Sequence, residues 1–196
     1  NKDGWQQEEY PETDLYHLPL EKVHDEQGHE IRITIPGPAE EIRAGVWKVL
    51  VGRVPLFLLD TNLRENPPHI REITARLYVS DPSIRLAQEI LLGIGGVQAL
   101  KAMGINPRVF HMNEGHPAFS CLERLAQTME MHHVDLRSAR EIIPRTTVFT
   151  THTPVPAGHD EFAPDLVKPY LHPFESRLRV SADEILSWGQ HAGAAE

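Results

Sequence analysis

The chain has 196 residues, of which 40% are hydrophobic and 24% are charged, as in an ordinary globular domain. This balance excludes intrinsic disorder, a coiled coil or a collagen-like fibre as the main state. The formal net charge of -9 argues against nucleic acid or an anionic membrane as the main partner. The longest apolar runs, such as Val54–Leu59, are far shorter than the roughly 20 residues of a membrane-spanning helix.

The sequence also bears on the compartment. A single cysteine, Cys121, excludes an intramolecular disulfide and a zinc site built from cysteines, and it suits a reducing cytoplasm. Residues 1–10 are polar and acidic, unlike a signal peptide. Because the chain lacks an initiator methionine and stops just after a helical pattern, we expect it to be a piece of a longer protein.

The first third of the chain has the patterns of β-strands. Residues Ile31–Ile35 alternate apolar and polar side chains, as a half-buried strand does. Two further apolar runs, Val46–Val51 and Val54–Leu59, flank Gly52-Arg53, which predicts a hairpin with a type II′ turn. Pro55 places its strand at a sheet edge or makes that strand irregular.

A long helix is predicted next. Ser80-Asp81-Pro82 is typical of a helix start, and Gly104 predicts a C-terminal cap after Met103. The apolar residues form two adjacent stripes, so we expect burial on more than one side. The segment Gly93-Ile94-Gly95-Gly96 resembles the start of a dinucleotide fingerprint, but it lies within a helix. Its glycines instead favour close approach of a neighbouring helix.

The rest of the chain alternates strands and helices. The predicted elements are a strand at Arg108–Met112, a helix from Pro117, a helix from Asp135 and a strand at Thr146–Thr150. This order predicts two parallel strands with a right-handed crossover and helices on the sheet faces. We therefore expect an α/β fold preceded by an antiparallel portion, divided into a β-rich part at 1–75 and an α/β part at 76–196.

Two polar loops follow the predicted parallel strands. The first is His111–Pro117 and the second is Thr150–Asp160. Because open parallel sheets bind ligands beyond the carboxyl ends of their strands, the two loops are a candidate site. Their Asn, Glu and His side chains offer donors and acceptors that suit a sugar. Each residue also has an ordinary explanation, since Asn113 is common in turns and Glu114 suits a helix N-terminus.

Twelve histidines raise the alternative of a metal-binding protein. His111 and His116 are five residues apart and straddle a turn, unlike the pair of a His-Glu-x-x-His helix. A zinc site needs three or four protein ligands, which the fold would have to bring together. The further histidines are His132, His133, His152, His159 and His172. Metal binding is therefore kept as a minor alternative.

At the two loops the chain resembles a known family. Val109–Phe119 and Val148–Asp160 look like the α-glucan phosphorylases (glycogen, starch and maltodextrin phosphorylases), above all their bacterial and archaeal branch. Trp47-Lys48-Val49, Leu58–Asn62 and Arg76–Glu89 resemble the segments before these loops. The resemblance implies part of the N-terminal, Rossmann-like lobe of a GT-B glycosyltransferase. That family uses phosphate to cleave terminal α-1,4 linkages of a glucan or maltodextrin and releases glucose 1-phosphate.

The resemblance also carries expectations about cofactor and partners. Family members hold pyridoxal 5′-phosphate on a lysine of their C-terminal lobe, a part that this chain does not match. The resemblance implies that the chain alone is inactive and binds no cofactor. It also implies that the C-terminal lobe of the enzyme is the partner of this chain. The whole enzyme is expected to be a cytoplasmic homo-oligomer. A stand-alone carbohydrate-binding module without catalysis is the main alternative.

The family's site residues carry over one at a time. His152 matches the histidine that contacts the glucosyl unit near its 6-hydroxyl, and its implied role is to position the sugar and its developing charge. The neighbouring Thr153 is expected to bind substrate as well. Asp160 aligns with an acidic residue at the mouth of the pocket.

The first loop carries over likewise. Asn113, Glu114 and His116 match the loop that lines the pocket beside the sugar. The animal enzymes resemble Asn-Asp-Thr-His-Pro at this place. Glu114 and Gly115 thus depart from the animal enzymes and agree with the bacterial branch.

Overall fold

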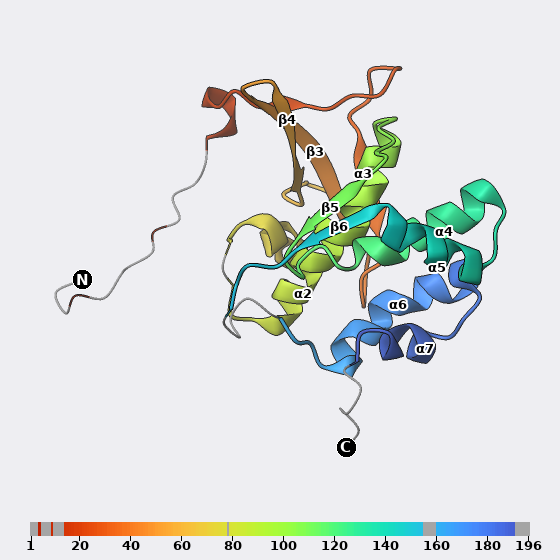
Figure 1. The fold of residues 1–196 in the computed structure, drawn as a ribbon. Coiled ribbons are helices and arrows are strands. Elements are labelled where there is room, and N and C mark those ends of the chain that lie inside the picture. The colour runs from red at the N-terminus through yellow and green to blue at the C-terminus, as the bar shows by residue number, and fades with distance from the viewer. Residues whose placement is uncertain (1–3, 5–8, 10–13, 78, 155–159, 191–196) are drawn as a thin grey trace.

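The structure is a computed structural model that describes residues 4, 9, 14–77, 79–154 and 160–190 (Figure 1). Its strands are β1 (Glu21–Lys22), β2 (Arg32–Ile35), β3 (Ile42–Val51), β4 (Val54–Asp60), β5 (Phe110–Asn113) and β6 (Thr147–Thr150). Its α-helices are α1 (Pro68–Arg71), α2 (Pro82–Ile90), α3 (Gly96–Ala102), α4 (Ser120–His132), α5 (Leu136–Arg145), α6 (Pro164–Leu178) and α7 (Ala182–Ser187). The predicted mixture of an antiparallel sheet and a parallel sheet is confirmed.

The antiparallel sheet is centred on β3. Strands β1 and β2 pair with β3 in succession, and β4 pairs along its other side, at the sheet edge. Gly52 has φ +62°, and Arg53 is not among the residues with positive φ, as a type II′ turn requires. Pro55 lies in β4, so the predicted edge position is confirmed.

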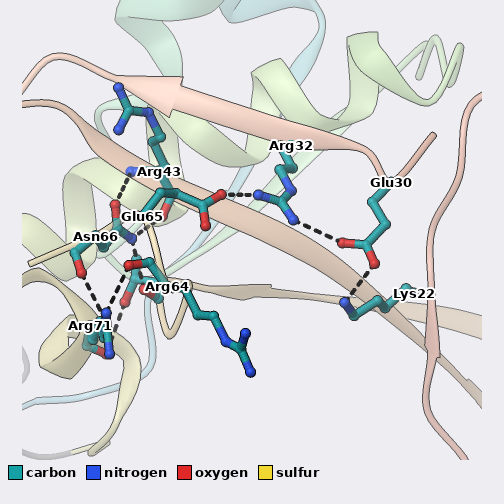
Figure 2. A network of polar contacts seen from close by, with 9 residues as sticks. Lys22, Glu30, Arg32, Arg43, Arg64, Glu65, Asn66 and Arg71 are labelled. Carbon is teal, nitrogen blue, oxygen red and sulfur yellow. Dashed lines mark hydrogen bonds and ion pairs between the residues drawn. The ribbon is translucent and has the colours of Figure 1, made fainter.

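A polar network fastens the segment after β4 to this sheet (Figure 2). Lys22 pairs with Glu30, Glu30 with Arg32, and Arg32 with Glu65. The buried Asn66 donates from Nδ2 to the carbonyl oxygens of Arg43 and Thr61 at 2.7 Å each. Because this buried amide bonds to backbone carbonyls on β3 and directly after β4, it fixes where the chain leaves the sheet.

A glycine-rich π-helical turn interrupts the helix that was predicted as continuous. Asp81 caps α2 as predicted, accepting from the backbone amides of Ser83 and Ile84. The π-helical turn Leu91–Gly95 then separates α2 from α3. Gly104, with φ +69°, follows α3 as the predicted cap.

Close packing explains the two glycines of the turn. A β-carbon on Gly93 would lie 2.7 Å from the backbone nitrogen of Ser120, which begins α4. A β-carbon on Gly95 would lie 2.8 Å from the Cδ1 atoms of Ile33 and Ile35 in β2. The prediction of close helix approach is therefore confirmed at Gly93, whereas Gly95 packs against side chains of β2 and Gly96 has nothing within 4 Å. The π-helical turn between α2 and α3 therefore packs against both β2 and the start of α4.

Strands β5 and β6 are parallel, as predicted, and α4 and α5 form the connection between them. Helix α4 begins at Ser120 rather than Pro117, because residues 117–119 form tight turns ahead of it. One hydrophobic core joins both parts of the chain, including Ile35 and Ile42 from the first sheet with Ile94 and Leu171 from the helices. The β3–β4 hairpin extends away from α6 and α7 (Figure 1). Among the described residues no helix is long and apolar enough to cross a membrane.

Replacing Gly93 by alanine is expected to destabilise the fold by about 1–3 kcal/mol, because backbone atoms stand where the β-carbon would go. Gly96→Ala is the matched control, since nothing lies within 4 Å of its added β-carbon. Alanine there is expected to stabilise the helix by up to about 1 kcal/mol. Urea unfolding of the two variants measures both effects. Equal free energies of unfolding for the two variants would contradict this account of the turn.

Candidate functional site

The parallel strands bring the two predicted loops to one sheet edge. Asn113 and Thr150 are register partners at the ends of β5 and β6. The backbone amide of Glu114 donates to the carbonyl oxygen of Thr150 at 2.8 Å, which extends the pairing by one step. Two short strands in register therefore place the first residues of both loops side by side.

Glu114 ties the two loops together through its carboxylate. Oε1 accepts from the backbone amides of His152 and Thr153, each at 2.9 Å. The amide of His152, followed by the Thr153 side chain, holds the pKa of Glu114 at about 2, against the effect of burial. The ionised carboxylate is thus the form that joins the loops at neutral pH.

Two further properties set Glu114 apart. Its φ of 58° lies in the left-handed region, which non-glycine residues rarely adopt. Its second oxygen, Oε2, is buried and has no hydrogen-bond partner among the described residues. A strained backbone and an unpartnered buried oxygen both cost free energy, and both are typical of functional sites.

The ring of His152 lies beside these groups and is open to solvent. Nε2 is 3.0 Å from Oδ1 of Asn113, and Nδ1 is 3.4 Å from Oε1 of Glu114. The side chain is nevertheless 60% exposed. The ring is therefore oriented by the first loop while more than half of the side chain stays exposed.

A second cluster lies where α2 meets the first loop. Arg85 donates from Nε to Oδ2 of Asp160 at 2.9 Å, and its Nη2 is 2.8 Å from Nδ1 of His116. The same Nδ1 is 2.9 Å from Oε1 of Glu89, whose side chain is 6% exposed. The helix α2 thus holds both His116 and Asp160.

The structure brings the predicted residues together in two groups. Asn113, Glu114, His152 and Thr153 form the first group, and His116 and Asp160 belong to the second. His111 makes a separate contact with Thr150. The predicted second loop is described only in part, since residues 155–159, and with them His159, lie outside the described residues.

The prediction from sequence missed Arg85 and Glu89 as site residues. The sequence does indicate that Glu89 is unusual. This acidic residue lies directly before Ile90, between the apolar stripes of a helix that is expected to be buried on two sides. A carboxylate at such a position needs a charged or hydrogen-bonding partner. The sequence did not reveal that the partner would be His116.

The second cluster also bears on metal binding. Within the described ranges, Glu89, His116 and Asp160 are the one group of three possible ligands, with ligand atoms within 4.8 Å of one another. Arg85 already directs its guanidinium at the ligand atoms of His116 and Asp160. The cluster thus contains its own cation, a donor set unlike that of a metal site.

The lysines of the described residues do not fit a covalently held aldehyde cofactor at this site. Lys22, Lys48 and Lys168 each place Nζ 2.6 Å from a carboxylate of a residue that belongs to neither loop. Lys101 is exposed on α3.

Glu114→Gln is expected to lower the thermal unfolding midpoint by a few degrees at neutral pH, because the neutral amide accepts the two backbone hydrogen bonds more weakly. Because the pKa of Glu114 is lower in the folded chain than in the unfolded one, its ionised carboxylate stabilises the fold at pH values above the unfolded pKa. This stabilisation is lost as the pH falls towards about 2. The difference between wild type and variant should therefore shrink below about pH 4.5. Calorimetry across this range measures it, with Glu41→Gln as the exposed control. A difference independent of pH would contradict the role of the charge.

Comparison with known proteins gives a consistent result. The chain is 43% identical to glycogen phosphorylase of Mycobacterium tuberculosis over 95% of its length, 42% identical to maltodextrin phosphorylase of Thermococcus litoralis over 97%, and 39% identical to glycogen phosphorylase of Aquifex aeolicus over 78%. No family model matches the chain. It spans only 22–23% of the length of these relatives. Over that stretch the chain belongs to the glycogen and maltodextrin phosphorylase family.

Proposed function

We propose that this chain forms the sugar-side wall of the catalytic cleft of an α-1,4-glucan phosphorylase, within the N-terminal lobe of a GT-B fold. The observation that carries the proposal is the Glu114 carboxylate, which accepts from the backbone amides of His152 and Thr153 and so holds the two polar loops together. Relatives that match nearly the whole chain are named glycogen or maltodextrin phosphorylase.

His152 positions the terminal glucosyl unit in this proposal. Its ring is held at Nε2 by Asn113 and has an exposed side for a sugar hydroxyl. A glucosyl transition state develops positive charge, and oriented polar groups in a closed site stabilise such charge. The ionised Glu114 lies 3.4 Å from the same ring and favours a positive charge nearby.

The other predicted residues supply hydrogen bonds. The unpartnered Oε2 of Glu114 is an acceptor available to a hydroxyl, and Thr153 adjoins it in the second loop. His116 lines the first loop. Asp160 acts through its ion pair with Arg85, which anchors the chain ahead of α6.

The remaining reaction groups are expected in the part of the relatives that this chain does not span. The substrate phosphate needs basic side chains, and an acidic Glu114 would repel it unless such residues face it. Pyridoxal 5′-phosphate, when bound there, supplies a phosphate group for proton transfer. We also expect the longer protein to be a cytoplasmic homo-oligomer with an α-glucan and phosphate as substrates.

The isolated chain is expected to release no glucose 1-phosphate from maltodextrin and phosphate, since one wall of a cleft lacks these groups. A coupled assay for glucose 1-phosphate tests this. Phosphorolysis by the purified chain would overturn the proposal. Calorimetric titration with maltoheptaose distinguishes the proposal from the alternative of a stand-alone carbohydrate-binding module. Tight binding by the isolated chain would identify such a module.

In the longer polypeptide, His152→Ala is expected to lower turnover by about 100-fold or more while leaving phosphate binding nearly unchanged. The reason is that the ring orients the sugar and not the phosphate. His172→Ala is the matched control, because that histidine is exposed on α6 and its polar contact among the described residues is with Glu175, away from both loops. Steady-state kinetics in both substrates measure the effect. Unchanged turnover in His152→Ala would refute the assigned role.

A further inference from the structure

The contacts of His116 converge on one ring nitrogen. Nδ1 lies 2.9 Å from Oε1 of Glu89 and 2.8 Å from Nη2 of Arg85. A carboxylate only accepts hydrogen bonds, so it requires a proton on Nδ1. A guanidinium only donates, so it requires a free electron pair there. While Glu89 is ionised, these two short contacts cannot both be hydrogen bonds.

The surroundings of Glu89 make both protonation states accessible. Within the described part of the chain, the charged or titratable groups that face it are Arg85 on its own helix, His116 on the first loop and Asp160 ahead of α6. Burial raises the pKa of Glu89 to about 7, although the hydrogen bond with His116 opposes the rise. The neighbouring Asp160 carboxyl raises the pKa of Glu89 further, whereas the charge of Arg85 lowers it.

The proton count of the pair determines the state of the other ring nitrogen, Nε2. With Glu89 ionised and the ring neutral, Nδ1 carries the proton and donates it to Glu89, so Nε2 is an acceptor. One added proton on the Glu89 carboxyl leaves Nδ1 as an acceptor and the ring proton on Nε2. One added proton on the ring instead protonates both nitrogens. In either protonated arrangement Nε2 is a donor.

We propose that Glu89 is a positioning residue that decides whether Nε2 of His116 accepts or donates a hydrogen bond to a ligand. Arg85 is a second positioning residue, since its pairing with Asp160 keeps the guanidinium beside Nδ1. The contacts of the His116 ring with Arg85, Glu89 and, at 3.4 Å, Asp160 are all made by Nδ1, which leaves Nε2 for the ligand. That the ligand is a sugar hydroxyl rests on the proposed function, whereas the proton arrangement does not.

Long-range 1H–15N NMR of His116 in the full chain tests the proposal, with His116→Gln to assign the signals. At about pH 8.5 the Nε2 resonance should be that of an unprotonated nitrogen, and at about pH 5.5 that of a protonated one. A protonated Nε2 at the higher pH would overturn the proposal. This result is read from the wild-type chain and so decides the question even if the Glu89→Met variant fails to fold.

Glu89→Met keeps the length of the side chain and removes its charge. The guanidinium of Arg85 is then the nearest polar group to Nδ1, at 2.8 Å against 3.4 Å for Asp160, so Nε2 should be protonated at both pH values. An unprotonated Nε2 in this variant at about pH 8.5 would show that Glu89 does not set the state of the ring. Glu40→Met is the matched control, because Glu40 pairs with the exposed His69 at the same 2.9 Å and should leave His116 unchanged.

Maltoheptaose binding by the longer polypeptide separates the two proposals. An unprotonated Nε2 at about pH 8.5 in a protein that does not bind maltoheptaose would refute the proposed function and leave the positioning role intact. Sugar binding with a protonated Nε2 at the higher pH would refute the positioning role alone.

Discussion

The carboxylate of Glu114 is the constraint on which the candidate site depends. One oxygen receives two backbone amides from the loop that follows β6, while the residue itself follows β5. Parallel strands end at the same sheet edge, but nothing in their ladder fixes the loops beyond that edge. A buried, ionised acceptor supplies that order, and its left-handed backbone is the conformational cost.

The position of α2 follows from a different interaction. The π-helical turn at Leu91–Gly95 packs against β2 and the start of α4 with no β-carbon on Gly93 or Gly95 in the way. This packing orients the preceding turns of helix, from which Arg85 and Glu89 reach the first loop. Apolar packing in the core and hydrogen bonding at the site are thus connected through one helix.

Much of this arrangement could be predicted from the sequence. The cap at Asp81, the edge strand with Pro55 and the parallel pairing of two short strands follow from local rules of turn and strand chemistry. The two loops could be placed at one edge for the same reason. The π-helical turn could not be foreseen, because it results from contacts between elements distant in sequence.

The partners within the site were equally beyond local rules. Asp160 and Arg85 are 75 residues apart in the chain, and Glu89 and His116 are 27 apart. Only the fold decides which charged side chains meet. A sequence pattern could show that Glu89 needed a partner, but several histidines and arginines were available.

A structure of the longer polypeptide with a bound maltooligosaccharide and phosphate is the most direct test of the central claim, that the two loops form the sugar-side wall of a cleft. The account predicts glucosyl hydroxyls within hydrogen-bonding distance of His152 and of the first loop, with the phosphate held by residues outside this chain. A sugar bound elsewhere, with His152 and Asn113 facing solvent, would contradict it.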